Sequence, residues 1–182
     1  MFQKALTEVA RALGSARIPY IIIGGQAVLL YGEPRMTRDI DIALGVDVDE
    51  FARVLAAMQA TQFEVLGADA KEFARKTRVL PLMDPQSGIR IDLIFSFSSY
   101  EQEAIQRAQI IRIGDTDVNY ASLEDLIIHK MVAGRPRDLE DVRGILAHHA
   151  VFDRSYILKW LRQFVPVVGR NLPSEFEKLV NL

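Results

Sequence analysis

The spacing of hydrophobic residues changes three times near the start of the chain, and a glycine lies at each change. Gly14 ends a run with apolar residues every three or four positions. Gly24-Gly25 ends a short run that is entirely apolar, and Gly32 closes a second helical pattern. Helical spacing indicates an amphipathic helix, and a short β-branched run indicates a buried strand. The pattern therefore predicts a helix over 2–14, a strand over 20–23 and a short helix over 26–31.

Strict alternation of apolar and polar residues predicts two half-buried strands further along the chain. Over 39–44, Asp39 and Asp41 share one face with Ala43, and isoleucine and leucine share the other. Over 89–95, Asp92 lies on the polar face, opposite four large apolar residues. The other β elements predicted are a strand over 77–83, joined to 89–95 by the turn-rich loop 84–88, and strands near 109–113 and 116–119.

From Ser122 onward the pattern is helical. Ser122 and Asp125 form a variant of the capping box, and Gly134 and Pro136 separate the first helix from the next. The fold class expected is α+β, a mixed sheet with helices on one face followed by a C-terminal helical segment. The tail is expected to hold further helices near 154–165 and 173–181, with 1–120 as the core and 121–182 packed on it as one compact unit.

Composition narrows the class of protein. The 182 residues are 49% hydrophobic and 25% charged, which is typical of a globular domain. The net charge of −2 excludes a general polyanion binder, so a nucleic-acid partner needs a local basic patch. There is no cysteine, no secretory signal pattern, and no apolar run near the roughly 18 residues of a membrane span. We expect a cytoplasmic protein without a membrane partner.

The aspartates carry the chemistry. If the strands over 39–44 and 89–95 are neighbours, then Asp39, Asp41 and Asp92 converge on one face of the sheet. Three such carboxylates repel one another unless a cation joins them, and hard oxygen ligands suit Mg²⁺. Two such ions about 4 Å apart can activate a hydroxyl and stabilise a leaving pyrophosphate. The competing interpretation is that these are solvated strand residues, although aspartate is uncommon in strands.

The glycine pair suits phosphate binding, because it lies between a strand and a helix whose N-terminus can face a triphosphate. A tight turn is the alternative interpretation of Gly24 and Gly25. The Walker pattern is absent, which argues against a P-loop enzyme. Arg38, just before the aspartate strand, is a candidate phosphate ligand or a solvated loop residue.

Lys130 falls inside the apolar stripe of its predicted helix, so it needs a partner or must extend to water. A bound triphosphate would be such a partner. Asp138, at the next helix start, suits either a cap or a contact with Lys130 or nucleotide. Asp141 is expected to be a solvated partner of Arg137 or Arg143.

Two other groups of residues favour ordinary structural roles. The histidines have no metal-ligand spacing, so solvent or core-edge positions are expected for His129, His148 and His149. A second group forms a basic strip that an RNA acceptor would favour, although a charged helix face is the simpler interpretation. This basic strip consists of Lys71, Arg75, Lys76 and Arg78.

The chain resembles the nucleotidyltransferase superfamily with the polymerase-beta-like palm, and within it the branch of the AbiEii and MenT type toxins. The resemblance rests on Gly24-Gly25, Arg35-x-Thr37-x-Asp39-Ile40-Asp41 and Ile91-Asp92-Leu93, with a looser match at Lys130 and 137–141. It covers roughly residues 18–145. It implies that Asp39, Asp41 and Asp92 bind metal, with Asp92 assisting the acceptor hydroxyl, and it supports a nucleotide contact for Lys130. With the position-based candidates, the nucleotide-binding residues expected are Gly24, Gly25, Arg38, Lys130 and Asp138.

The resemblance implies a Mg²⁺- or Mn²⁺-dependent enzyme, with two ions, that transfers NMP from an NTP to a hydroxyl on tRNA or protein. It also implies a toxin–antitoxin or phage-defence setting with a cognate antitoxin. The family often has Gly-Ser where this chain has Gly24-Gly25, which removes one hydroxyl contact to phosphate. A non-catalytic nucleotide-binding or interaction module of the same fold is the alternative, although no metal aspartate is missing. A calcium loop is excluded because Asp39-Ile40-Asp41-Ile42 lacks the required glycine.

Overall fold

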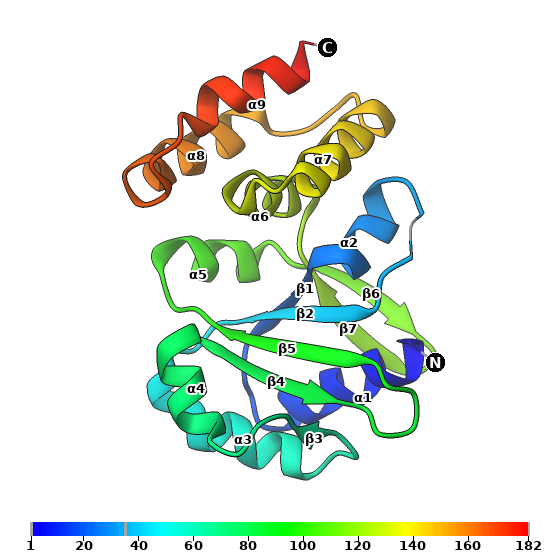
Figure 1. The fold of residues 1–182 in the computed structure, drawn as a ribbon. Helices are drawn as coiled ribbons and strands as arrows, with labels where there is room; N and C mark the ends of the chain where they lie inside the picture. Colours follow the sequence, from blue (N-terminus) through cyan, green and yellow to red (C-terminus); the bar gives the residue numbers. More distant parts are fainter. Residues whose placement is uncertain (1, 35, 182) are drawn as a thin grey trace.

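The structure is a computed structural model that describes residues 2–34 and 36–181 (Figure 1). Within these residues seven strands form one mixed sheet. The strands are β1 (Tyr20–Ile23), β2 (Asp39–Leu44), β3 (Glu64–Val65), β4 (Val79–Met83), β5 (Arg90–Phe95), β6 (Gln109–Ile113) and β7 (Thr116–Tyr120). The helices are α1 (Phe2–Ser15), α2 (Gly24–Tyr31), the 3₁₀ turn η1 (Val48–Glu50), α3 (Phe51–Gln59), α4 (Ala70–Thr77), α5 (Ser99–Gln106), α6 (Leu123–Ala133), α7 (Pro136–His148), α8 (Arg154–Val168) and α9 (Leu172–Val180).

The sheet has the strand order β3-β4-β5-β2-β1-β7-β6. Strands β2 and β5 are parallel, as are β1 and β7, and the other neighbours are antiparallel. The aspartate strand β2 is therefore central, with β5 on one side and β1 on the other. This pairing joins segments about fifty residues apart in the sequence.

One face of the sheet holds much of the hydrophobic core. Ile40 and Ile42 of β2 and Ile91 and Leu93 of β5 are completely buried on this face. It is covered by α1, α3 and α4 (Figure 1), and Phe51 of α3 packs with its ring 6.2 Å from that of Phe95. Each large apolar side chain buried in this way contributes about 1.5–3 kcal/mol. The alternating patterns predict this face correctly, because side chains of a strand alternate between the two faces.

The opposite face carries the aspartates and is partly covered by α2 and the C-terminal helices (Figure 1). Helix α2 packs on β1, β2 and α6, and the Tyr31 hydroxyl donates a hydrogen bond of 2.9 Å to the Ala121 carbonyl. The expected α+β class is thus confirmed, with helices on this second face as well. Ala43 is buried, so only the Asp39 and Asp41 end of β2 remains accessible from this side.

The predicted elements are present, with shifts at their ends. The short helix predicted over 26–31 is present as α2, but it begins two residues earlier, at Gly24. The strand predicted from residue 77 begins at Val79, because Asp69 caps α4 and that helix extends through Thr77. The strand β3 and the helix α5 have no counterpart in the prediction, while α4 carries most of the charged helix face that was the simpler interpretation of the basic strip. No helix in the two described ranges is both long and apolar enough to cross a bilayer.

Candidate active site

The register of the central strands places the predicted aspartates together. Asp41 of β2 lies directly beside Asp92 of β5 in the parallel ladder, and Ile23, the last residue of β1, lies beside Asp41 on the other side. Neighbouring strands are about 4.8 Å apart, so the Asp41 and Asp92 side chains leave the same face at adjacent positions. Asp39 lies one pleat away on that face. The three carboxylates line one cleft of about 670 Å³, as the alternation in each strand predicts.

Gly24 fits closely against Asp41. Its φ of +64° lies in the left-handed region that favours glycine. A Cβ built at Gly24 would lie 2.0 Å from Oδ2 of Asp41 and 3.0 Å from its Cβ, so the aspartate occupies the space of a side chain. Helix α2 begins here, and no side chain caps its N-terminus. Gly24 and Gly25 of this uncapped first turn line the cleft, where a phosphate could accept from their N–H groups.

The surroundings of Asp41 disfavour the charged form of its carboxyl group. Burial raises the pKa of the Asp41 carboxyl, and the nearby Asp92 and Asp39 raise it further, while Lys130 and Arg135 act in the opposite direction. Repulsion among carboxylates is relieved when a divalent cation binds between them. Three carboxylates on one face supply the hard oxygen donors that Mg²⁺ or Mn²⁺ prefers, so the residues present fit such an ion in donor type.

The Asp92 carboxylate has a partner of its own. Its Oδ1 accepts a hydrogen bond of 2.9 Å from Nε of Arg90, two residues earlier on the same face of β5. Within residues 2–34 and 36–181, no three acidic, histidine or cysteine side chains are already grouped so that they could hold a metal ion. The metal-ligand role of Asp39, Asp41 and Asp92 therefore stays a prediction.

Lys130 is buried between two aspartates. Its Nζ lies 2.9 Å from Oδ1 of Asp138 and 2.8 Å from Oδ2 of Asp141, and only 6% of its side chain is exposed. Lys130 therefore does not extend to water, and Asp141 is buried rather than solvated as expected. Both aspartates come from α7, which packs on α6 and so brings them to the lysine. An ammonium has three donors, so a third can still serve a ligand in the cleft, which Lys130 lines.

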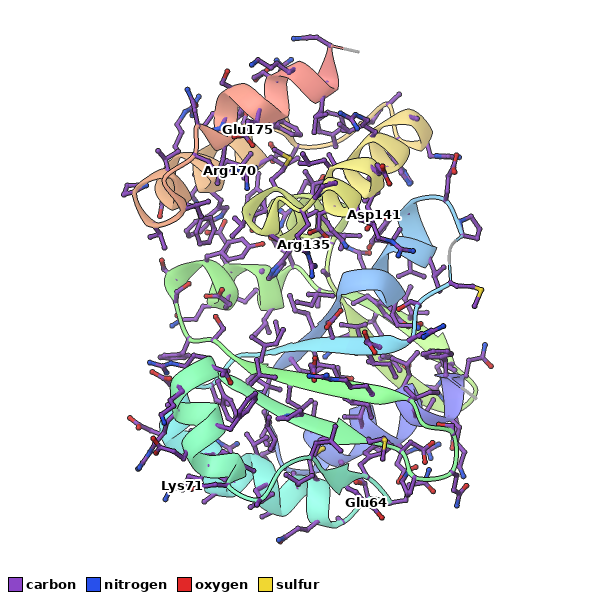
Figure 2. All side chains as sticks on the ribbon, viewed as in Figure 1. Glu64, Lys71, Arg135, Asp141, Arg170 and Glu175 are labelled. Atoms are coloured by element: carbon purple, nitrogen blue, oxygen red, sulfur yellow. The ribbon has the colours of Figure 1, made fainter. Side chains whose placement is uncertain are left out.

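Asp138 combines both roles that the sequence suggests. It bonds Lys130, and its Oδ2 accepts from the Arg135 backbone N–H at 3.2 Å, which caps α7. The Arg135 guanidinium also donates to it at 2.6 Å. Burial alone would raise the pKa of Asp138, but these hydrogen bonds from Arg135 and Lys130 lower it. Figure 2 shows Arg135 on the side of α6 and α7 that faces the sheet.

Arginines give the cleft its positive charge. Arg38, Arg135 and Arg137 line it together with the aspartates, and all three are exposed. Among the described residues Arg38 and Arg137 have no ion-pair partner, so their charge is available to a bound anion. Arg135 was not predicted as a site residue, although the sequence Gly134-Arg-Pro-Arg places two cations beside the turn where a helix begins. Arg35, part of the motif quoted above, lies outside the described residues.

The other residues singled out in the sequence lie away from this cleft. His148 is exposed, and His149 bonds the Tyr31 carbonyl at 2.9 Å, as core-edge positions require. In the basic strip on and just after α4, Lys76 pairs with Glu72 at 3.3 Å and Arg78 pairs with Asp47. Half of its charge is thus neutralised within the molecule, which favours the charged-helix interpretation over an RNA-binding strip.

Several solved structures share this fold. The chain is similar to a nucleotidyltransferase-like protein from Paracoccidioides brasiliensis, with 20% identity over 93% of this chain and 91% of that one and a TM-score of 0.59. It is similar to ANT(2'')-Ia in complex with adenylyl-2''-tobramycin, with 16% identity over 97% of each chain and a TM-score of 0.56. It is also similar to the lincosamide antibiotic adenylyltransferase LnuA, with 16% identity over 80% of this chain and 97% of that one and a TM-score of 0.55. The fold is that of a nucleotidyltransferase.

The family assignment follows from the sequence itself. Residues 3–151 match the model of the nucleotidyltransferases of unknown function DUF6036, and the chain belongs to that family. No curated protein matches the chain. The protein is therefore a nucleotidyltransferase, and its matched region includes every aspartate of the cleft. The AbiEii and MenT branch is not the family that this match gives.

Proposed function

We propose that this enzyme transfers a nucleoside monophosphate from an NTP to a hydroxyl group and releases pyrophosphate, with Mg²⁺ or Mn²⁺ at Asp39, Asp41 and Asp92. The observation that carries the proposal is the direct neighbourhood of Asp41 and Asp92 beside the uncapped start of α2. One cleft thus offers ligands for a divalent cation and donors for phosphate oxygens. Either feature alone would fit many proteins that handle phosphates.

The transfer requires one bond to form and one to break. The acceptor oxygen bonds to the α-phosphorus, and the bond from that phosphorus to the oxygen bridging to the β-phosphate breaks, so pyrophosphate leaves with the electron pair. The acceptor proton passes to the Asp92 carboxylate and from there to water. Divalent cations, when bound, supply charge stabilisation for the nucleophile and for the leaving group.

The remaining residues hold the nucleotide. The backbone N–H groups of Gly24 and Gly25 donate to phosphate oxygens, and Arg38 and Lys130 add positive charge there. Asp138 contributes by fixing the Lys130 ammonium at 2.9 Å, which is a positioning role. We extend the proposal to Arg137, because it is exposed in the same cleft and has no ion-pair partner among the described residues.

Two classes of acceptor are compatible with this chemistry. The resemblance to AbiEii and MenT toxins favours tRNA or protein, a cytoplasmic toxin–antitoxin or phage-defence setting and a cognate antitoxin. The exposed arginines at the cleft support this class, because they can contact an RNA backbone. The similarity to ANT(2'')-Ia and LnuA favours a small hydroxyl-bearing molecule. The partial neutralisation of the basic strip supports that second class.

One assay tests the reaction. The protein is incubated with Mg²⁺ or Mn²⁺ and each α-labelled NTP in turn, with total RNA, cell protein or a small-molecule extract as acceptor. We expect label transfer by the wild type and its loss in Asp41→Asn. Nucleotide binding without transfer to any acceptor would instead support a non-catalytic module. Growth arrest on expression of the wild type, but not of Asp41→Asn, would support the toxin setting.

A further inference from the structure

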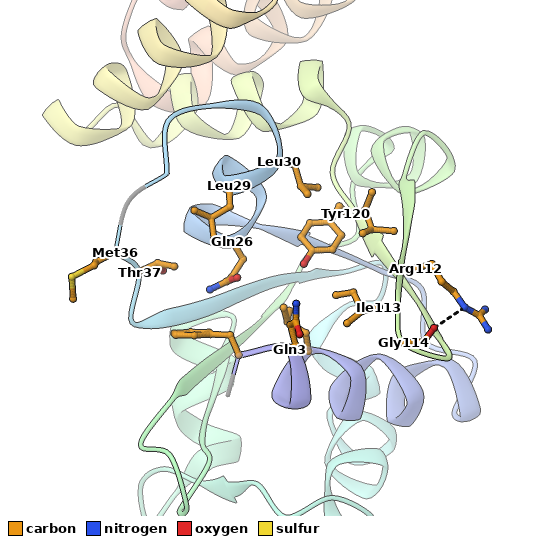
Figure 3. Close-up of a pocket in the computed structure, with 13 residues that line it drawn as sticks. Gln3, Gln26, Leu29, Leu30, Met36, Thr37, Arg112, Ile113, Gly114 and Tyr120 are labelled. Carbon is orange, nitrogen blue, oxygen red and sulfur yellow. Dashed lines mark hydrogen bonds between the residues drawn. The ribbon is translucent and has the colours of Figure 1, made fainter.

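A second pocket, of about 700 Å³, lies beside the aspartate cleft (Figure 3). It is bounded by the start of α1, the outer side of α2 and the β6–β7 hairpin. Its walls are largely apolar, formed by Phe2, Leu6, Leu29, Leu30, Ile111 and Ile113. Leu29 and Leu30 are 41% and 38% exposed, which is unusual for adjacent leucines of an otherwise packed helix. The volume lies within the range of about 300–1,000 Å³ found for small-molecule sites.

Two buried polar groups face this pocket without a partner. Gln26 of α2 is 5% exposed and Tyr120 of β7 is 4% exposed. Within residues 2–34 and 36–181, neither the Gln26 amide nor the Tyr120 hydroxyl makes a hydrogen bond to another protein group. Figure 3 shows both side chains directed into the same space. Neither residue has a polar atom among the fully buried side-chain atoms left without a partner in the described part of the chain, so the small exposed part of each includes its polar end, which is open to the pocket and available to a ligand.

Tyr120 remains a donor at any ordinary pH. Burial, with a smaller effect of Tyr20, raises the pKa of the Tyr120 hydroxyl to about 12. The Gln26 amide both donates and accepts. Together they can bond a group that carries both functions, such as a hydroxyl or a neutral amide.

The pocket and the cleft share part of their walls. Met36 and Thr37 line both of them, and α2 contributes Gly24 and Gly25 to the cleft and Gln26 to the pocket. Thr37 is tied to the aspartate strand, because its hydroxyl donates to the Asp39 carbonyl at 3.0 Å. The pocket therefore adjoins the start of β2, where Asp39 lies, with Met36 and Thr37 between the two spaces.

The two spaces differ in charge. Four cations and four aspartates line the cleft, which suits phosphates and metal. Of the described residues that line the pocket, only Arg112 is charged, and it lies 2.8 Å from its partner Asp117. The pocket is therefore close to neutral and favours an uncharged, partly apolar occupant over a polyanion or a polycation.

We infer that this pocket binds the acceptor, an uncharged amphipathic small molecule with an apolar body and at least one hydroxyl. The apolar body lies against Leu29, Leu30 and Ile113, and a polar group bonds Gln26 and Tyr120. This inference rests on the proposed function, because only a nucleotidyl transfer calls for an acceptor beside the aspartates. It selects the small-molecule class of acceptor over tRNA and protein.

Binding is tested without metal or nucleotide, so the outcome does not depend on catalysis. The probe is n-octyl β-D-glucopyranoside below its micelle concentration, added to the full chain labelled with ¹³C at Met, Ile and Leu methyl groups. We expect saturable shifts of the Met36, Leu30 and Ile113 signals. Gln26→Leu, which keeps the volume and removes the amide, should weaken binding about tenfold, as loss of one hydrogen bond to a ligand does. Leu30→Asp, at a half-exposed position, should abolish it.

The matched control is Val167→Asp, which adds the same charge at an apolar position that is 81% exposed and lies outside the pocket. It should bind the probe like the wild type. Absence of shifts at the pocket methyls, or equal binding by Leu30→Asp, would overturn the inference. Shifts of those methyls by ATP alone would place the nucleobase there and overturn the acceptor assignment. Shifts that depend on protein concentration would assign the pocket to a second copy of the chain and overturn it too.

A transfer assay separates this inference from the proposed function. With α-labelled NTP, Mg²⁺ and an extract of small metabolites, Gln26→Leu should raise KM for the acceptor about tenfold and leave KM for the NTP unchanged. If Asp41→Asn retains transfer, the proposed function fails. If Asp41→Asn loses transfer but label enters RNA or protein in the wild type and Gln26→Leu has no effect, only the acceptor inference fails.

Discussion

The carboxylate of Asp41 fills the space that a side chain at Gly24 would need, since a Cβ there would lie 2.0 Å from Oδ2. The glycine thus serves the aspartate as well as the turn. Its left-handed φ is a first reason for glycine, and the close approach of Asp41 is a second. This contact holds the turn between β1 and α2 against β2, the strand that carries Asp39 and Asp41.

Substituting Gly24 should affect both stability and activity. Gly24→Ala is expected to lower the free energy of unfolding by about 2–4 kcal/mol, from backbone strain plus displacement of Asp41. It should also abolish transfer. Gly88→Ala is the matched control, because Gly88 has a φ of +70° but nothing within 4 Å of an added Cβ. Urea denaturation should show a loss of only about 1–2 kcal/mol for this control, and equal losses for both variants would contradict the role of the contact.

Asp41→Asn should stabilise the metal-free protein while it removes activity. Burial and the neighbouring aspartates raise the folded-state pKa of Asp41 above its unfolded value. The folded state then binds more protons between these two pKa values, so the contribution of Asp41 to stability falls as the pH rises through that window. Above the window, near pH 8, Asp41→Asn should melt a few degrees higher than the wild type. Below the ordinary pKa of aspartate the two should melt together.

Calorimetry across pH in a chelating buffer measures this difference, and Asp49→Asn at an exposed position serves as the control. Addition of Mg²⁺ at pH 8 should then raise the midpoint of the wild type but not that of Asp41→Asn. A lower midpoint for Asp41→Asn at pH 8 without metal would show that the carboxylate is stabilised by the fold and not destabilised.

Lys130 is expected to be a major determinant of stability. Lys130→Met leaves Asp138 and Asp141 without the ammonium that lies 2.9 and 2.8 Å from them, at nearly full burial. Breaking a buried pair from one side costs about 3–5 kcal/mol. Lys76→Met removes an exposed lysine that pairs with Glu72 at 3.3 Å and should cost less than about 1 kcal/mol. Comparable losses for the two variants in chemical denaturation would contradict a buried ion cluster.

The cleft arginines should affect nucleotide binding without affecting stability. Arg38→Ala and Arg137→Ala each remove an exposed cation with no ion-pair partner in the described part of the chain. We expect each to raise KM for the NTP about tenfold, with the melting midpoint unchanged, because a contact to phosphate is worth about 1.5–3 kcal/mol. Arg162→Ala, an exposed residue of α8 outside the cleft, should leave KM as it is. Steady-state kinetics and a melting curve on each variant provide both readouts.

We expect residues 1–120 and 121–182 to unfold as one unit. Helix α6 packs on α2, and the Tyr31 hydroxyl reaches the Ala121 carbonyl across the boundary. Trp160 is the only tryptophan and lies in α8, so its fluorescence reports the tail, while far-ultraviolet circular dichroism reports the whole chain. The two urea transitions should coincide. An earlier fluorescence transition would make the tail a separate folding unit.

The sequence by itself determined most of the local structure and the identity of the aspartates. The alternation over 39–44 and 89–95 places Asp39, Asp41 and Asp92 on the faces of their strands that are opposite the large apolar residues, because side-chain direction in a strand repeats every two residues. Gly134, with a φ of +63°, ends α6 where a helix stop is predicted. Such features depend on residues a few positions apart, and the backbone geometry is the same in every protein.

Tertiary structure alone decided which of these faces meet. The neighbourhood of Asp41 and Asp92 depends on the parallel pairing of β2 with β5, across a chain separation that local periodicity does not encode. The partners of Lys130 depend on how α7 packs on α6, and that packing turned Asp141 from an expected surface residue into a buried one. The unpartnered Gln26 amide has no sequence signal at all. Long-range contacts of this kind are set by the packing of the whole core.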